Sequence, residues 1–218
     1  MENIQNFRLI LITGPKHTGK SSVGCMVAQY KKGMFIDLDE LVEHQTGRKP
    51  RTLYKEGPHI FRRAEAAALK SLFDSPENIC ALLYDQINIQ SYDPLIDTKN
   101  KKPLIIAAGG GLIDNEDAMA LLKKSVDEDI KPIIYNKTEI FIIYLDVSAD
   151  TAWNRIMRSA GQSGELPAFL QTADPKTTHR SLHIRRSRAY RETAHFIIHG
   201  ENKSAEYIAQ EIASLDIF

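Results

Sequence analysis

The chain has 218 residues, of which 43% are hydrophobic and 26% are charged, a composition that fits one folded domain and excludes an intrinsically disordered protein. Its 28 basic side chains balance its 28 acidic ones, so no strong field attracts polyanions and we expect no nucleic acid partner. No apolar run approaches the roughly 18 residues of a membrane span, and no secretory signal opens the chain. We therefore expect no membrane contact and a cytoplasmic location.

The first chemical motif directly follows the apolar run Leu9–Ile12. Residues Gly14–Ser21 fit G-x-x-x-x-G-K-[ST] without a gap, between an expected strand and an expected helix. Such a loop turns several backbone N–H groups toward one anion, and the helix dipole adds to the attraction. The pattern predicts a P-loop, with Lys20 on the terminal phosphates of a nucleotide and Ser21 on magnesium. The alternative is a glycine-containing turn that carries these letters by chance.

Short apolar runs alternate with helical patterns along the chain, which predicts an α/β fold with a parallel sheet covered by helices. We expect the first strand over about Arg8–Thr13 and the first helix over about Gly19–Tyr30. Later strands are expected at Met34–Ile36, Leu104–Ile106 and Phe196–Ile198, and later helices at Glu40–Thr46, Ile60–Phe73, Asn115–Lys124 and Ala205–Leu215.

Two aspartates, Asp37 and Asp39, follow the second expected strand. Ligands of open α/β sheets bind at the carboxyl ends of strands, and the alternation of a strand would send both carboxylates to the same side. We expect one to hold the magnesium shell and the other to bind a substrate hydroxyl. The alternative is that one of them only caps the next helix.

Two further segments carry candidate ligand contacts. Arg62 and Glu65 lie three residues apart on one helix face, where the carboxylate could hold the arginine as a rigid fork for a ligand carboxylate or phosphate. The alternative is a solvated salt bridge. Gly109, Gly110 and Gly111 directly follow a strand, where bare backbone lets a ligand approach closely. A tight turn alone would explain one or two of these glycines.

In this order, the motifs resemble those of the shikimate kinases, which are small P-loop kinases of the nucleoside monophosphate kinase-like architecture. The matching segments are Gly14–Ser22, Asp37–Asp39, Phe61–Glu65, Gly109–Gly111 and, in a late helix, Arg186 four residues before Tyr190. The resemblance implies a three-layer P-loop NTPase sandwich with a five-stranded parallel sheet, helices on both faces and a lid. Residues 1–218 would form a single kinase domain, with a substrate-binding helical section at about 38–75 and the lid at about 159–174.

The resemblance also implies an activity, transfer of the γ-phosphoryl group of ATP to the 3-hydroxyl of shikimate in the biosynthesis of chorismate and aromatic amino acids. Lys20 and Asp39 would be catalytic, and Ser21 and Asp37 would hold Mg²⁺. The ATP-binding residues would be Gly14, His17, Thr18, Gly19, Lys20, Ser21, Ser22 and Arg158. The substrate-binding residues would be Asp39, Phe61, Arg62, Glu65, Gly109, Gly110, Gly111 and Arg186.

The chain departs from the family pattern in the lid. Shikimate kinases usually carry Arg-Pro-Leu-Leu there, whereas the segment Leu166–Gln171 puts Leu166 or Pro167 at the arginine position. An arginine at a transferring phosphate can contribute orders of magnitude in rate, so we expect a substitute among Lys16, Arg155, Arg158 and Arg180. Two alternatives stay open: a nucleotide-binding sensor that has lost catalysis, and a P-loop kinase for another small hydroxylated acid.

Several remaining features carry no predicted chemistry. Residues 76–102 and 126–137 lengthen the chain relative to the compact family, and we expect surface elaborations there. Cys25 and Cys80 have no metal-ligand spacing and are expected to be buried free thiols. The basic stretch Thr177–Arg191 lacks the aromatic partners of a nucleic acid site. The expected assembly is a monomer or a weak homo-oligomer.

Overall fold

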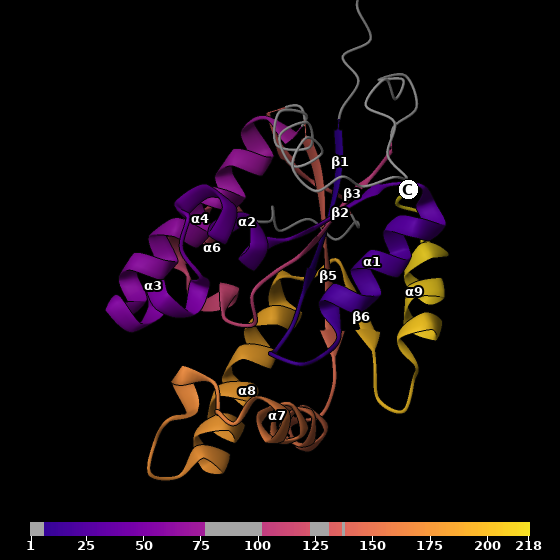
Figure 1. Ribbon diagram of the computed structural model, residues 1–218. Helices are drawn as coiled ribbons and strands as arrows, with labels where there is room; N and C mark the ends of the chain where they lie inside the picture. The colour runs from indigo at the N-terminus through magenta and orange to yellow at the C-terminus, as the bar shows by residue number, and fades with distance from the viewer. Residues whose placement is uncertain (1–6, 77–101, 123–130, 137) are drawn as a thin grey trace, which may run out of the picture.

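The computed structural model describes residues 7–76, 102–122, 131–136 and 138–218 (Figure 1). Its centre is a six-stranded sheet. The strands are β1 (Phe7–Thr13), β2 (Met34–Asp37), β3 (Leu104–Ala107), β4 (Ile133–Tyr135), β5 (Thr138–Asp146) and β6 (Phe196–His199). The order β2-β3-β1-β5-β6 is parallel throughout, so the expected five-stranded parallel sheet is confirmed.

Two strands, β5 and β4, had no counterpart among the four strand ranges expected from the sequence. Strand β4 pairs antiparallel with the first residues of β5, and it belongs to the second insertion. That insertion is therefore part of the sheet in its described portion, where it extends the edge beside the start of β5. Most of the first insertion, together with Cys80, lies outside the described residues.

The central strand β1 explains why the phosphate loop lies in the middle of the edge. All four residues of Leu9–Ile12 are fully buried, because β1 lies between β3 and β5 and both faces of the sheet are covered. Leu9 and Leu11 belong to one hydrophobic cluster, and Ile10 and Ile12 belong to another on the opposite face. The loop after Thr13 therefore leaves a rigid, doubly packed strand.

Helices cover the two faces of the sheet, as expected (Figure 1). One layer consists of α1 (Lys20–Lys31) and α9 (Ala205–Ala213), which pack on each other. The other consists of α2 (Leu38–Thr46), α3 (Pro50–Glu56), α4 (Pro58–Asp74) and α6 (Glu116–Leu121), and the 3-10 helix η1 (Leu112–Asp114) leads into α6.

Helix α7 (Ala149–Ser163) and the first turns of α8 (Pro175–Thr193) lie beyond the carboxyl edge of the sheet, and the two helices are joined through η2 (Ala168–Leu170) (Figure 1). The last turns of α8 pack beside β5. Gly161 lies within α7, and Gly164 ends the helix with a φ of 76°. Residues 159–163 of the expected lid are thus helical, and the chain leaves the helix only at Gly164.

The first helix corrects a prediction about Cys25. Its inner face consists of Val23, Gly24, Val27 and Ala28, so Cys25 points outward and is exposed rather than buried. No helix among the described residues is long and apolar enough to cross a membrane.

Candidate active site

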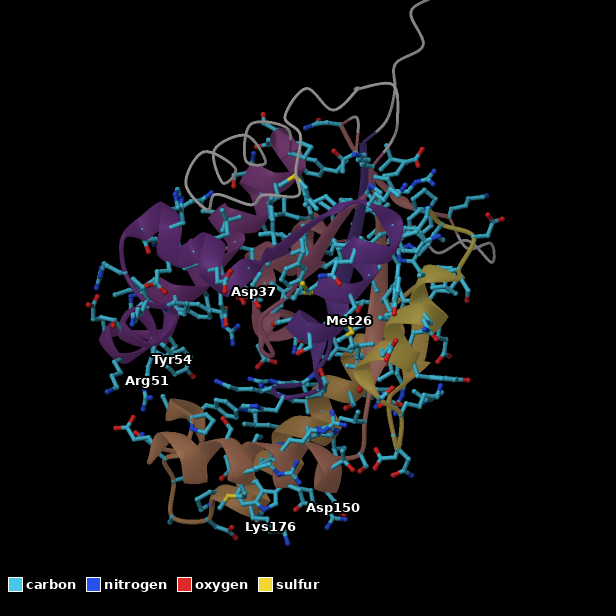
Figure 2. The ribbon with its side chains drawn as sticks, turned by 45° about the vertical axis from the view of Figure 1, so that its right-hand side comes forward. Met26, Asp37, Arg51, Tyr54, Asp150 and Lys176 are labelled. Atoms are coloured by element: carbon cyan, nitrogen blue, oxygen red, sulfur yellow. The ribbon has the colours of Figure 1, made fainter. Side chains whose placement is uncertain are left out.

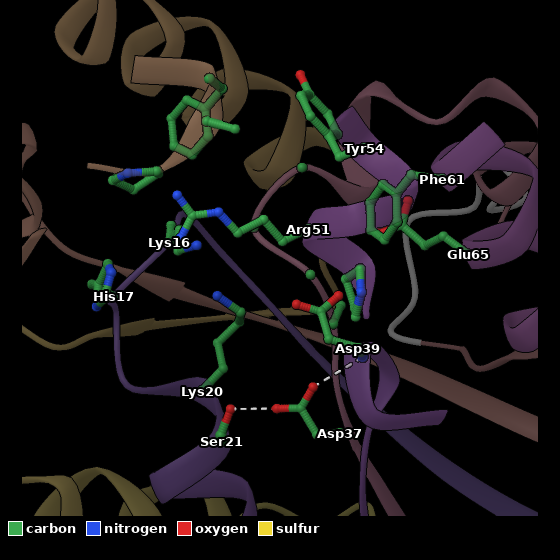
Figure 3. Close-up of a pocket in the computed structure, with 18 of the residues that line it drawn as sticks. Lys16, His17, Lys20, Ser21, Asp37, Asp39, Arg51, Tyr54, Phe61 and Glu65 are labelled. Atoms are coloured by element: carbon green, nitrogen blue, oxygen red, sulfur yellow. Dashed lines mark hydrogen bonds between the residues drawn. The ribbon is translucent and has the colours of Figure 1, made fainter. Parts of the chain in front are cut away.

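A cavity of about 690 Å³ opens at the carboxyl edge of the sheet, between the phosphate loop, the α3 and α4 helices and the segment after α7 (Figure 3). Most of the residues that we predicted to bind ligands line this one cavity. They are His17, Gly19, Lys20, Ser21, Ser22, Asp37, Asp39, Phe61, Arg62, Glu65, Gly109, Gly110, Gly111 and Arg186. Gly14 and Thr18 belong to the same loop but are not part of the lining.

Backbone conformation shapes the phosphate loop. Gly14, His17 and Gly19 all have positive φ, at 142°, 62° and 98°, and His17 is the one among them whose side chain makes this conformation costly. Lys20 Nζ donates to the carbonyl oxygens of Gly14 at 2.9 Å and Pro15 at 2.8 Å. Burial lowers the pKa of Lys20 to about 8, although Asp39 and Asp37 oppose the shift. A bound phosphate would counter this effect, because it offers the ammonium a negative partner.

Asp37 links the phosphate loop to the start of α2. Its Oδ2 accepts a hydrogen bond from Ser21 Oγ at 2.6 Å, and its Oδ1 accepts one from the backbone N–H of Asp39 at 3.0 Å (Figure 3). Asp37 is therefore the N-cap of α2 and the partner of Ser21 at once. The strand alternation that we predicted for the two aspartates was wrong, because Asp39 already belongs to α2. The first helical turn nevertheless brings both carboxylates to the cavity.

Two buried carboxylate oxygens face the triple glycine. Glu65 is fully buried, and its Oε2 accepts hydrogen bonds from Asn115 Nδ2 at 2.9 Å and Arg62 Nη1 at 3.3 Å. Glu65 Oε1 and Asp39 Oδ1 have no hydrogen-bond partner among the described residues. A Cβ atom on Gly109 would lie 2.8 Å from the first and 3.2 Å from the second. Two acceptors thus converge on one small space, which suits a ligand that donates hydrogen bonds.

Burial also sets the protonation of these carboxyl groups. It raises the pKa of Asp39, with a further contribution from Asp37, while Lys16 and Lys20 act in the opposite direction. It likewise raises the pKa of Glu65 against the hydrogen bond from Asn115 and the charge of Arg62. A carboxylate with a raised pKa accepts a proton more readily than an exposed one.

Arg62 and Arg186 meet at the same end of the cavity, although they lie on α4 and α8. Arg186 donates to Asp114 Oδ2 through Nε at 2.9 Å and Nη2 at 2.7 Å, and Arg62 Nη2 lies 3.8 Å from the same oxygen. Arg62 Nη1 also donates to the carbonyl oxygen of Gly111. The ring of Phe169 lies 5.6 Å from the guanidinium carbon of Arg186. One carboxylate therefore orients both arginines.

The phosphate loop and the triple glycine are in direct contact. A Cβ atom on Gly110 would lie 2.7 Å from the backbone nitrogen of Lys16 and 3.0 Å from its Cα. Only a residue without a side chain allows this approach. Lys16 therefore lies where the phosphate-binding end of the cavity joins the other end.

Several lining residues were missed from the sequence. Arg51 and Tyr54 reach the cavity from α3, Phe169 reaches it from η2, and Asp114 and Asn115 support it through Arg62, Arg186 and Glu65. The rings of Tyr54 and Phe61 pack edge to face, with 6.2 Å between their centroids. The nearness of Asp114 and Asn115 to the triple glycine was the one sequence signal for them, and α3 carried no recognisable motif.

The four residues expected to replace the lid arginine differ in their position relative to the cavity. Lys16 lines the cavity. Arg155 donates to the carbonyl oxygens of His17 at 3.4 Å and Thr18 at 3.2 Å, so it supports the loop from α7. Arg158 and Arg180 are exposed and lie outside the lining, so the structure does not bring Arg158 together with the other predicted ATP-binding residues.

The family model and two similar relatives indicate one family. The family model for shikimate kinase matches residues 17–82 and 93–216. A shikimate kinase of Nitrosospira multiformis is 26% identical over 205 residues, which cover 94% of this chain and 82% of the relative. One from a Marinomonas species is 24% identical over 204 residues, covering 93% and 88% of the two chains.

Solved structures show the same likeness. The structure of shikimate kinase from Acinetobacter baumannii in complex with shikimate has a TM-score of 0.67 and 25% identity, with 96% of this chain and 92% of that chain covered. The Aquifex aeolicus enzyme matches at a TM-score of 0.59 and 19% identity, over 94% and 92% of the two chains, which shows a shared fold. Because the family match takes in Lys20, Asp39, the triple glycine and Arg186 within one chain, this protein belongs to the shikimate kinase family of phosphotransferases.

Proposed function

We propose that this protein transfers the γ-phosphoryl group of ATP to the 3-hydroxyl of shikimate. Shikimate carries one carboxylate and three hydroxyl groups on a six-membered ring. The carrying observation is that one cavity combines an arginine pair for a carboxylate with two buried, unpartnered carboxylate oxygens for hydroxyls, next to a phosphate loop. The shikimate bound in the Acinetobacter baumannii relative supports the same substrate.

The donor half of the reaction uses the phosphate loop. The loop N–H groups and Lys20 would bind the phosphates, and Lys20 would exchange its two carbonyl partners for phosphate oxygens. Ser21 Oγ and Asp37 Oδ2 are hard oxygen ligands only 2.6 Å apart, so they fit neighbouring positions around Mg²⁺. When bound, the ion would neutralise charge on the phosphates.

The acceptor half uses Asp39 and the arginine pair. Arg62 and Arg186 would bind the substrate carboxylate, and Glu65 Oε1 would accept a hydrogen bond from one hydroxyl. Asp39 would orient the 3-hydroxyl and take its proton as the oxygen attacks the γ-phosphorus. Its raised pKa favours that proton transfer.

Apolar side chains would hold the carbon ring between these polar groups. Phe61 and Tyr54 form one wall, and Phe169 faces the cavity from the segment after α7. We propose that residues 164–174 act as the lid of a single kinase domain and that about 38–75 form its substrate-binding section. Phe169 then has two roles, since it also packs on Arg186.

The direct test is ADP release measured by a coupled assay with Mg²⁺ and ATP, with and without shikimate, beside calorimetric titration of shikimate. We expect ADP only when shikimate is present, in equal amount to shikimate 3-phosphate. Nucleotide binding without turnover would instead support a nucleotide-binding sensor that has lost catalysis, an alternative suggested by the absence of the lid arginine. Turnover of a different hydroxylated acid such as quinate, and not of shikimate, would support the second alternative, a P-loop kinase for another small hydroxylated acid.

A further inference from the structure

Arg51 reaches the cavity from a helix that carries none of the sequence motifs. It follows Pro50 in the first turn of α3, and its Nη2 forms an ion pair with Glu165 Oε2, on the segment after α7. In Figure 2, Arg51 and Tyr54 lie at the tip of the helical layer, on the side that faces α7 and α8. In Figure 3, the Arg51 side chain extends across the cavity toward Lys16.

The place that Arg51 reaches is the junction of the two halves of the cavity. The backbone of Lys16 packs directly against Gly110, at the contact between the phosphate loop and the triple glycine. Burial lowers the pKa of Lys16, the Arg51 guanidinium lowers it further, and the Asp39 carboxylate raises it. Arg51 and Asp39 therefore both interact electrostatically with Lys16, at the point where a phosphoryl group would pass from the phosphate loop to the acceptor.

Four other cations in or beside the cavity each make at least two contacts with the protein. Lys20 binds two loop carbonyl groups, Arg62 and Arg186 share Asp114, and Arg155 binds the loop from outside. Arg51 differs because its ion-pair partner lies near solvent: 45% of the Arg51 side chain and 55% of the Glu165 side chain are exposed. Such pairs stabilise a protein little, so a phosphoryl group can replace the carboxylate at small cost.

We propose that Arg51 binds the transferring phosphoryl group and stabilises its charge in the transition state, and that Glu165 holds Arg51 between turnovers. The inference rests on the phosphoryl transfer proposed above. The bond from the γ-phosphorus to the bridging oxygen breaks, and its electron pair leaves with ADP. A new bond forms to the 3-hydroxyl oxygen, and the hydroxyl proton passes to Asp39. Arg51 forms no covalent bond and donates hydrogen bonds to the phosphoryl oxygens.

In this arrangement, the positive charge at the phosphoryl group comes from the opposite side of the cavity to the lid. The lid segment has Leu166 and Pro167 at the position where an arginine was expected, and it carries Glu165 beside them. The cation instead comes from α3, on the substrate side, and the lid supplies its counter-ion. Closure of the lid and placement of the guanidinium are thereby coupled through one ion pair.

The test compares Arg51→Ala with wild type. We expect kcat to fall about 100-fold, because an arginine on the transferring group acts mainly in the transition state. The KM for ATP and the Kd for shikimate should stay within about threefold, since neither substrate is bound mainly by Arg51. Guanidinium ion added to the assay should restore part of the activity of this variant, and Arg51→Lys should keep more activity than Arg51→Ala.

Arg48→Ala is the matched control. Arg48 pairs with Glu56, is similarly exposed and lies outside the cavity lining, so its removal should leave kcat near that of wild type. Thermal unfolding of each variant separates a folding defect from a catalytic one. If Arg51→Ala does not fold, the Arg51→Lys variant provides the comparison of kcat.

A double-mutant cycle tests the role of Glu165. Glu165→Gln should raise kcat about threefold in the wild-type background, because the phosphoryl group no longer competes with a charged partner for Arg51, and this gain should disappear in the Arg51→Ala background. Wild-type turnover of shikimate combined with an Arg51→Ala kcat within about threefold of wild type would overturn this inference and leave the proposed function intact. A loss confined to shikimate affinity would also overturn it, and absence of wild-type turnover would overturn both.

Discussion

The two ends of the cavity are built in different ways. At the phosphate end the contacts are local in the chain: Thr18 Oγ1 donates to the Pro15 carbonyl oxygen at 3.1 Å, and Lys20 donates to Gly14, six residues earlier. At the acceptor end, Arg186 and Asp114 are in contact across 72 residues of sequence. A short motif can therefore encode the first end almost completely, whereas the second exists only after α4, η1 and α8 have packed together.

The difference extends to how each end holds its charges. The Lys20 ammonium donates hydrogen bonds to two backbone carbonyl groups, which a side-chain substitution does not remove. Arg62 and Arg186 share the Asp114 side chain, which also pairs with Arg185, and Arg62 has the Glu65 side chain as a second partner. Substitutions should therefore separate the two ends in function, so that loss at one leaves ligand binding at the other intact.

Asp39→Asn should give the largest effect. The amide cannot accept the proton of the 3-hydroxyl, so kcat should fall about 10³-fold, as for removal of a general base. Binding of a non-hydrolysable ATP analogue, measured by calorimetry, should change less than about threefold, because the phosphate end keeps its contacts. Equal losses of turnover and nucleotide binding would mean that Asp39 serves both ends and would break the comparison.

Asp114→Asn should give the next largest effect. Without the charge of Asp114, Arg186 loses its carboxylate partner while Arg62 keeps Glu65, and the KM for shikimate should rise by about 10- to 100-fold, in line with the loss of a charge-assisted hydrogen bond. The KM for ATP should stay unchanged. Asp117→Asn is the matched control, because Asp117 is exposed in the first turn of the neighbouring helix α6 and does not line the cavity. A shikimate KM equal in both variants would remove Asp114 from the clamp.

The smallest effect concerns pH at the phosphate end. The pKa of Lys20 is lowered to about 8 in the ligand-free protein, and phosphates bind the protonated form. Affinity for the ATP analogue should thus be nearly constant below pH 7.5 and fall about tenfold between pH 7 and pH 9, as the ammonium loses its proton. Lys20→Arg does not titrate in this range and should show a flat profile at weaker affinity. A wild-type profile equally flat would contradict the lowered pKa.

The same shift has a defined sign for stability. The pKa of Lys20 is lower in the folded protein than its usual value of 10.5, so burial of the ammonium opposes folding below pH 8. That opposition weakens as the pH rises from about 8 to 10.5, where the folded protein has released the proton and the unfolded chain has not. Nucleotide binding counteracts the opposition at lower pH by supplying negative charge.

Much of the fold could be predicted because its signals are local. The fully apolar run Leu9–Ile12 predicted a central strand, and the glycines and lysine after it predicted the loop, because backbone conformation there depends on neighbouring residues. The start of α2 was placed at Glu40 rather than Leu38, because an N-cap at Asp37 and a continuing strand have similar sequences over three residues. Strand β4 was missed because its three residues acquire strand pairing only from β5.

The candidate site likewise has features that depend on neighbouring residues and features that depend on tertiary packing. The sequence by itself determined the phosphate loop, the triple glycine and the pairing of Arg62 with Glu65, since each depends on residues within a few positions of one another. Only the tertiary structure decided that Asp114 orients two arginines and that Arg51 meets Glu165 across the cavity, 114 residues later. The physical reason is that charges and hydrogen bonds act through space over a few ångströms, and which distant residues come that close is fixed by the packing of helices on the sheet.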